Sequence, residues 1–294
     1  MDERDDRVFE EVRPTLLGLA YRILGSRADA EDAVQDTFLK WRTADRAAVE
    51  NPAAWLTAAC TRRCLDLLRS AHRSRVDYVG AWLPEPVHTA VENEAERRLD
   101  LASSLTTAFL LMLERLTPKE RAAYLLHEIF DVPYAEVART LEMQEPACRK
   151  LVSRAKAHVE QAKVRHATPV DRQEELLSAF QAAVAGGTTA RLAALLSEEV
   201  RFSADGGGKV PTVLDVLQGK ATVLALVADR LREWWAGYEW LRADINGGRG
   251  ILLRKDGATV AALSFAYDEA GLVSDVFVMR NPDKLAALGA GAIH

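Results

Sequence analysis

Residues 116–162 read LTPKERAAYLLHEIFDVPYAEVARTLEMQEPACRKLVSRAKAHVEQA, and their pattern indicates how the middle of the chain folds. Apolar residues recur at helical spacing through most of it, and polar breaks interrupt the pattern at residues 131–133 and 142–144. Short helices joined by tight breaks are typical of a helix-turn-helix. The spacing therefore predicts three helices, which cover residues 116–130, 134–141 and 146–162.

The third predicted helix has two different faces. At about 100° per residue, one face is apolar and comprises Cys148, Leu151, Val152, Ala155, Val159 and Ala162. The opposite face carries Arg149, Lys150, Ser153, Arg154 and Lys156. Such a face suits a DNA major groove, where Arg and Lys reach guanine edges or phosphates and Ser bonds to either. An ordinary basic surface helix is the alternative, but the preceding helix at helix-turn-helix spacing favours DNA.

The composition is that of a globular protein with more than one domain. The 294 residues predict two or three domains, and 49% are hydrophobic and 28% charged. No apolar run approaches the roughly 20 residues that span a membrane, and the charged residues 1–6 are not a secretory signal. These features predict a cytoplasmic protein without a membrane contact. The net charge of −5 argues against a protein that coats nucleic acid by charge alone and favours a subunit with local basic surfaces.

The three cysteines do not indicate a metal site. Cys60 and Cys64 are one helical turn apart in an otherwise apolar stretch, and Cys148 lies on the apolar face of the third helix. Cys60 and Cys64 could help to bind a metal, but a second pair of ligands is missing nearby, so buried thiols are favoured. We predict neither a metal site nor a cofactor.

Residues 28–41 are predicted to form a helix with an acidic face. Ala30, Val34 and Trp41 share one side, whereas the other side carries Asp32, Gln35, Asp36 and Leu39. An exposed leucine among carboxylates is typical of a docking surface for a basic partner helix. A solvated charged face with one stray leucine is the alternative, which the residues alone favour.

A further helix is predicted over residues 53–69, after a polar connection and Pro52. Trp55 lies on this largely apolar helix together with Arg62 and Arg63. Aromatic side chains beside arginines suit single-stranded nucleic acid, because bases stack and phosphates pair. A buried helix whose arginine stems reach the surface is equally compatible with the pattern.

Together these stretches resemble an extracytoplasmic-function sigma factor, the promoter-recognition subunit of bacterial RNA polymerase. DAEDAVQDTF at residues 29–38 resembles the region-two helix that docks on the polymerase. PAAWL at 52–56, continuing to DLLR at 66–69, resembles the helix that melts and reads the downstream promoter element. Residues 116–162 resemble region four, which reads the upstream element. The three stretches occur in the order found in the family.

The resemblance implies core RNA polymerase and promoter DNA as partners. It assigns the polymerase contact to Asp32, Gln35, Asp36 and Leu39. It assigns the upstream element to Arg149, Lys150, Ser153, Arg154 and Lys156, and the downstream element to Asn51, Trp55, Arg62 and Arg63. It also makes the loop at 43–52 the pocket for a flipped base. The chain departs from the family at Glu142 and Gln144, where a glycine and a Ser or Thr cap are common.

The chain continues for more than a hundred residues beyond the sigma-like part. Helices are predicted at residues 171–185, 188–196 and 221–235, and strands at 200–204, 238–245, 258–267 and 272–279, with a possible short strand at 251–254. Helices followed by strands indicate an α+β domain. This part resembles a SnoaL-like cone, in which a curved sheet wraps a pocket against helices.

Three distant motifs resemble the sigma-factor subgroup with a fused SnoaL-like extension. They are Trp82-Leu83-Pro84-Glu85-Pro86, Asp205-Gly206-Gly207-Gly208-Lys209 and Asn281-Pro282-Asp283-Lys284-Leu285. The resemblance implies a regulatory interface that controls the sigma core within the same chain. Residues 167–293 contain no histidine and show no acid–base pair, so we do not expect an enzyme. The glycine turn could cradle an anion, but a simple tight turn is favoured.

The predicted fold is multidomain, with two all-α sigma domains followed by an α+β cone. The predicted boundaries are 1–75 for region two, 76–92 for the linker, 93–165 for region four and 171–288 for the SnoaL-like domain. A DNA-binding regulator controlled by a small molecule in the cone is the alternative function. A conventional dimeric repressor is a third, but it leaves the acidic helix without a role.

Overall fold

The computed structural model describes residues 3–76, 78–88, 104–161 and 168–289. Contacts divide the chain into two compact units. Unit 1 contains residues 1–76, 93–104 and 112–162, and unit 2 contains residues 77–92, 105–111 and 163–294. Short segments from the middle of the sequence therefore belong to the same unit as the C-terminal part.

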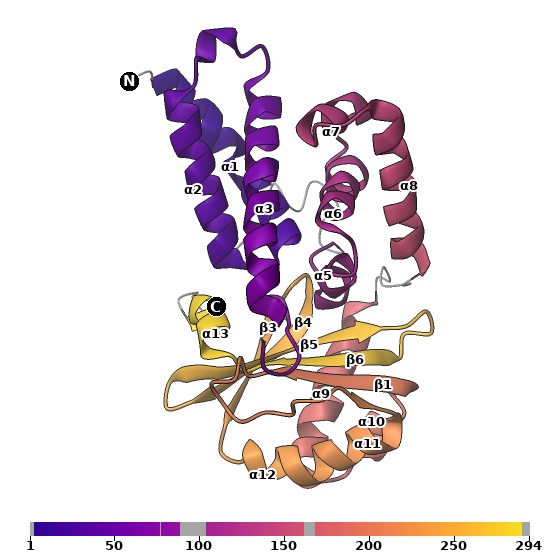
Figure 1. Cartoon of the computed structure of the whole chain (residues 1–294). Coiled ribbons are helices and arrows are strands. Elements are labelled where there is room, and N and C mark those ends of the chain that lie inside the picture. Colours follow the sequence, from indigo (N-terminus) through magenta and orange to yellow (C-terminus); the bar gives the residue numbers. More distant parts are fainter. Residues whose placement is uncertain (1–2, 77, 89–103, 162–167, 290–294) are drawn as a thin grey trace. The chain divides into compact units, whose positions relative to one another are not determined.

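The first part of unit 1 is a bundle of α1 (Glu3–Leu24), α2 (Arg27–Thr43) and α3 (Pro52–Val76), which pack on one another (Figure 1). The short 3₁₀ turn η1 (Arg46–Ala48) lies between α2 and α3. Gly25 has a φ of +68° and ends α1, and the Ser26 side chain caps α2 by accepting a hydrogen bond from the Asp29 N–H. Trp41 is buried in this bundle together with Cys60 and Cys64.

The second part of unit 1 confirms the three predicted helical segments. These are α6 (Pro118–Tyr124) with its π-helical continuation η3 (Leu125–Ile129), then α7 (Tyr134–Thr140) and α8 (Glu145–Gln161). Thr117 and Glu120 form a capping box at the start of α6. Glu142, which stands where the family often has a glycine, adopts a φ of +54°, a backbone conformation that favours glycine. Nevertheless α8 begins directly after this turn, at Glu145.

Unit 2 is built on one six-stranded sheet with the order β2-β1-β6-β5-β4-β3. The strands are β1 (Leu196–Asp205), β2 (Leu217–Gln218), β3 (Glu239–Ile245), β4 (Gly248–Lys255), β5 (Ala258–Tyr267) and β6 (Val273–Met279). β1 and β6 are parallel, and the other neighbours are antiparallel. The helical segments are α5 (Thr107–Leu113), which begins in this unit, α9 (Val170–Gly186), α10 (Ala190–Ala193), α11 (Lys220–Ala225), η4 (Leu226–Leu231), α12 (Arg232–Trp234) and α13 (Pro282–Gly289).

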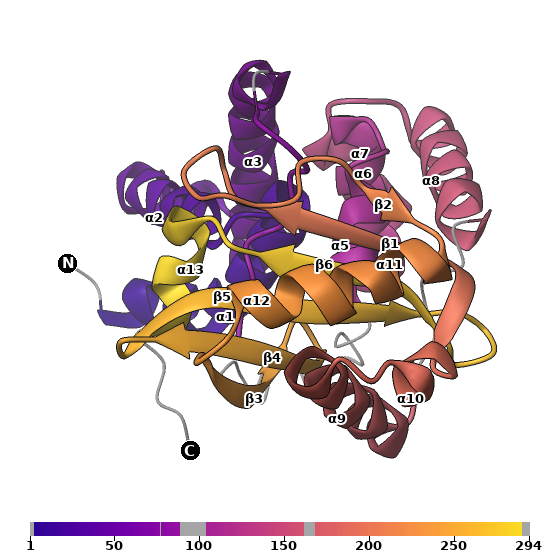
Figure 2. The ribbon, with the colours of Figure 1, turned by 90° about the horizontal axis from the view of Figure 1, so that it is seen from below.

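Alternation along the strands gives this sheet two apolar faces. In β6, Val276 and Val278 belong to one buried cluster, whereas Phe277 and Met279 belong to the other. The first cluster lies under α9 to α12, which cover one face of the sheet (Figures 1 and 2). The second cluster contains Leu83 of the linker together with side chains of α13. A segment from the middle of the sequence therefore contributes to the core of the C-terminal part.

The predicted α+β extension is confirmed; β2 and α13 were not predicted, and two predicted elements differ in extent. The helix predicted at residues 188–196 shrinks to α10, because Leu196 already pairs with Val273 as the first residue of β1. The possible short strand at 251–254 is a full central strand, β4, because the Asn246-Gly247 turn pairs it with β3 from Gly248 onward.

Gly250 in β4 offers a test of sheet packing. A Cβ at this position would lie 2.4 Å from the Leu263 carbonyl oxygen of the neighbouring strand. We expect Gly250→Ala to lower the free energy of unfolding by about 1–3 kcal/mol, because the strands must separate to admit the methyl group. Gly186→Ala is the control, since a Cβ there has no neighbour within 4 Å. Equal melting temperatures of the two variants would contradict the expectation.

Candidate functional site

The exposed face of α8 carries all five residues predicted to read upstream DNA. Cys148, Leu151, Val152, Ala155 and Val159 are buried, as the periodicity predicts, whereas Ala162 lies outside the described residues. Arg149, Lys150, Ser153, Arg154 and Lys156 are exposed on the other side. The helix therefore packs through one face and presents the polar one.

Acidic neighbours orient most of the basic side chains on α8. Arg149 pairs with Glu145 at 2.6 Å, and its guanidinium lies 4.3 Å from the Tyr134 ring centroid. Arg154 lies 3.5 Å from Glu120. Lys156 donates to Glu128, and this hydrogen bond raises the pKa of Lys156. These ion pairs orient the long basic side chains, and the glutamates partly neutralise their positive charge.

The acidic face of α2 is open at three of its four predicted positions. Asp32 and Gln35 are exposed, and the Leu39 side chain beside them is 51% exposed. Asp36 instead pairs with Arg63 of α3, with 2.6 Å between Oδ2 and Nε. A residue predicted to contact polymerase and a residue predicted to contact DNA therefore bind each other.

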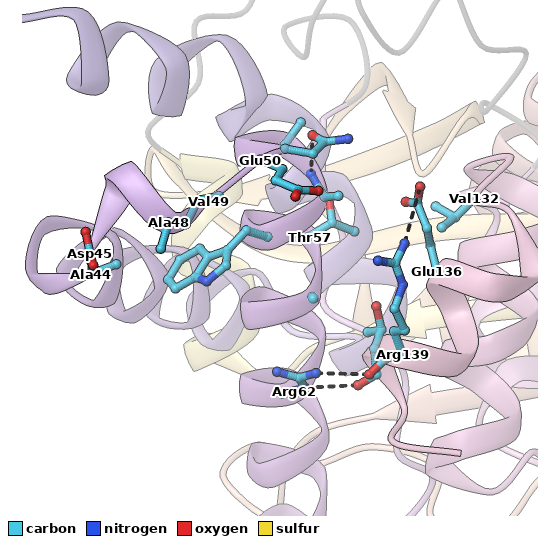
Figure 3. A pocket seen from close by; sticks show the side chains of 16 residues that line it. Ala44, Asp45, Ala48, Val49, Glu50, Thr57, Arg62, Val132, Glu136 and Arg139 are labelled. Atoms are coloured by element: carbon cyan, nitrogen blue, oxygen red, sulfur yellow. Dashed lines mark hydrogen bonds and ion pairs between the residues drawn. The ribbon is translucent and has the colours of Figure 1, made fainter. Parts of the chain in front are cut away.

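The other predicted downstream residues lie around a cavity of about 770 Å³ (Figure 3). Asn51 caps α3 by accepting a hydrogen bond from the Ala54 N–H. Trp55 lines the cavity and packs against Trp41, with 5.3 Å between ring centroids. The loop at residues 44–50 forms part of the wall. Arg62 also lines it, and donates from Nε to the Thr140 carbonyl oxygen and from Nη2 to that of Arg139, both at 3.0 Å.

In unit 2, the three motifs of the predicted regulatory interface meet at the buried carboxylate of Asp205. Its Oδ1 accepts from the Tyr78 hydroxyl at 2.6 Å and from the Gly207 N–H at 3.0 Å. Its Oδ2 accepts from the Leu83 N–H at 2.9 Å and from Lys284 Nζ at 2.8 Å. Asp205 is 0% exposed, so these four donors replace water completely.

Lys284 completes this site, which we call the linker clasp and define as Tyr78, Leu83, Asp205, Asn281 and Lys284. Besides Asp205, its ammonium group donates to the Leu83 carbonyl oxygen at 2.6 Å. It also lies 4.5 Å from the Trp82 ring centroid and 5.0 Å from that of Tyr78. One lysine thus pairs with the Asp205 carboxylate and binds the linker through a backbone oxygen and two aromatic faces.

The glycine turn after Asp205 is shaped by a close contact. Gly207 has a φ of +61°, and a Cβ there would lie 2.3 Å from Nδ2 of Asn281. That amide donates to the Tyr78 hydroxyl at 2.9 Å. Burial and the hydrogen bond to Asp205 raise the pKa of Tyr78. Lys209 pairs with Asp283 across the two motifs. These contacts favour a structural turn over an anion cradle.

The rest of the linker motif packs into unit 2. Leu83, Pro84, Glu85 and Pro86 are buried, and Leu285 of α13 joins Leu83 in the same apolar cluster. Pro282 and Asp283 are exposed at the start of α13. The cavity between linker and sheet measures about 10 Å³, which is about one water probe sphere.

Sequence reasoning missed two residues of this region. Asn246, at a φ of +50°, accepts the Val87 N–H and donates to the Leu105 carbonyl oxygen. Tyr78 was not predicted as a contact. The Asn-Gly pair between two strand patterns could have indicated the hairpin turn at Asn246, but its partners lie 159 and 141 residues away.

A search of the described residues finds no group of three or more His, Cys, Asp or Glu side chains placed to hold a metal ion. In the same part of the chain, no helix has the length and apolar character to cross a membrane. Cys60, Cys64 and Cys148 are buried free thiols. A hydrogen bond with Cys60 and burial raise the pKa of Cys64.

Comparisons with known proteins agree with these features. Residues 8–74 match the family profile of Sigma-70 region 2, and residues 106–159 match that of Sigma-70, region 4. ECF RNA polymerase sigma factor SigJ of Mycobacterium tuberculosis is 38% identical over 286 residues, which cover 94% of this chain and 91% of that protein. Probable ECF RNA polymerase sigma factor SigI of the same species is 29% identical over 95% of both chains.

The similarity extends to the three-dimensional structure. The crystal structure of M. tuberculosis SigJ aligns with a TM-score of 0.73 and 33% identity, over 96% of this chain and 98% of the other. The alignment thus includes the C-terminal extension as well as the helical part. From its two sigma regions and its near full-length similarity to SigJ, the chain belongs to the extracytoplasmic-function RNA polymerase sigma factors.

Proposed function

We propose that this sigma factor directs promoter-specific transcription initiation and that its C-terminal extension regulates it in cis through the linker clasp. The clasp is the observation that carries the proposal. It fixes residues 78–88, which lie between region two and region four in the sequence, to the extension, because Tyr78 and Leu83 form hydrogen bonds with the buried Asp205–Lys284 ion pair. Movement of the linker away from the extension would therefore break its hydrogen bonds with Asp205 and Lys284.

For initiation, we assign core polymerase to the acidic face of α2 and promoter DNA to α8 and α3. The exposed Leu39 beside Asp32 supports the first assignment, because an apolar side chain framed by carboxylates suits a basic helix. The exposed basic face of α8 supports the second, because Arg and Lys there can reach base edges and phosphates. Binding that weakens with salt is expected.

The extension acts in this proposal as a regulator and not as an enzyme. Asp205, the most buried carboxylate of the three motifs, is saturated by four donors and is poorly suited to transfer a proton. No histidine occurs in residues 167–293. Work on polymerase would place the protein in the bacterial cytoplasm.

The polymerase assignment predicts that Leu39→Asp weakens binding to core polymerase by about tenfold or more, because it removes an apolar anchor at an interface. Titration of labelled full-length protein with core polymerase measures this. Leu214→Asp in the extension is a matched control, because Leu214 is 56% exposed. Equal affinity of the Leu39 variant and the wild type would show that this face is only solvated.

The clasp predicts that Lys284→Met raises transcription by about threefold or more, because a lost partner leaves the buried Asp205 uncompensated and loosens the linker. The assay uses core polymerase and a promoter selected from a random DNA library by the holoenzyme. Hydrogen exchange at the Leu83 and Val87 amides reports linker release. The control is Lys220→Met, which breaks the Lys220–Glu198 pair in the same unit.

Tyr78→Phe is the milder second variant if Lys284→Met lowers the melting temperature below that of the assay. It removes only the hydroxyl bonded to Asp205 and Asn281, at a cost of about 1 kcal/mol. Faster exchange of the linker amides with unchanged transcription in either variant would overturn regulation through the clasp, while leaving the sigma function intact.

A further inference from the structure

Within unit 1, region two and region four each donate hydrogen bonds from an arginine side chain to backbone oxygens of the other region. Arg62 of α3 donates to the Thr140 and Arg139 carbonyl oxygens at the end of α7, each at 3.0 Å (Figure 3). In the opposite direction, Arg121 of α6 donates from Nη1 to the Ile23 carbonyl oxygen at the end of α1, at 2.7 Å. Each region therefore contributes one arginine to a helix end of the other.

These contacts use a general property of helices. The last carbonyl groups of a helix have no partner within the helix and form the negative end of its dipole, so a guanidinium group is stabilised there. Arg121 is only 3% exposed, and its charge is further matched by Glu114 at 2.7 Å. Arg62 gains a second charge contact from Glu142 at 3.5 Å. A buried arginine so placed fixes the two regions against each other.

The same arrangement covers the cavity predicted to accept promoter DNA. One wall comes from region two and includes Trp55 and Arg62, and the other comes from Val132, Glu136, Arg139 and Thr140 at and before α7. Glu136 brings a carboxylate to this wall, where it would repel a phosphate backbone. Nε and Nη2 of Arg62 donate to carbonyl oxygens of region four and are therefore not available to nucleic acid in this arrangement.

We propose that unit 1 is a closed form of the sigma core, latched by Arg62 and Arg121, in which region four masks the downstream-element surface of region two. Arg62 is a shared residue, since it binds α7 in the closed form and promoter DNA in the open form. The two states therefore compete for one side chain, and separating the regions is required before downstream DNA binds. This inference rests on the proposed role of Arg62 in DNA binding.

The test uses the full-length chain without polymerase and the variant Arg121→Met, which removes one of the two latch arginines but none of the proposed DNA-binding residues. The probe is a fluorescent single strand that carries the downstream element of the selected promoter. We expect about tenfold tighter binding than for the wild type, as for a typical coupling between two states. Adding Arg62→Met to Arg121→Met should abolish the gain. Arg13→Met is the control, because Arg13 lies on α1 and pairs only with Glu10 among the described residues.

Small-angle X-ray scattering gives a readout that does not depend on DNA. Arg121→Met should increase the radius of gyration, and Arg13→Met should not. Glu142→Arg should increase it as well, and this variant does not disturb the core because the Glu142 side chain is 77% exposed. An unchanged radius in both latch variants would overturn the closed form. A larger radius without tighter DNA binding would overturn the masking of Arg62, and transcription by the wild type would show that the sigma function itself still holds.

Discussion

The neutralisation of one buried carboxylate organises unit 2. An isolated ionised Asp in an apolar interior costs many kcal/mol, and its pairing must be nearly complete to offset that cost. Asp205 meets this demand with donors from three parts of the chain: its own glycine turn and two distant segments, the linker and α13. Because all three must be in place together, the carboxylate makes linker docking and extension folding interdependent.

The helical part of the chain follows from its sequence more directly than the sheet does. Periodicity is a local property, so the buried and exposed faces of α8 can be read from residues 146–161 alone. Glu142 shows the limit of such reading. It is a poor residue for a left-handed turn, yet packing of α8 on α6 and on α7 holds it at a φ of +54°. Tertiary contacts here override a weak local preference.

The contacts of the candidate sites were less accessible from sequence. The three motifs around Asp205 could be recognised by resemblance, but neither Tyr78 nor Asn246 could, because a hydrogen bond between residues more than a hundred positions apart leaves no periodic pattern. Arg62 is similar. Its place beside Trp55 indicates nucleic acid, whereas its bonds to Arg139 and Thr140 depend on where a separate helix packs. Residue type predicts what a side chain can bind, and the fold decides what it does bind.

The order of synthesis determines when the linker clasp can form. Leu83 and its partner Lys284 are 201 positions apart, and Lys284 lies near the C-terminal end of the described chain. A ribosome that adds roughly 5–20 residues per second needs about 10–40 s to travel that distance. Region two is synthesised before this interval and region four during it, whereas Lys284, which binds the linker between them, is added only at its end. In the proposed mechanism, regulation through the clasp therefore begins only after Lys284 has been synthesised, and a chain whose synthesis stops before residue 284 carries both sigma regions without this restraint.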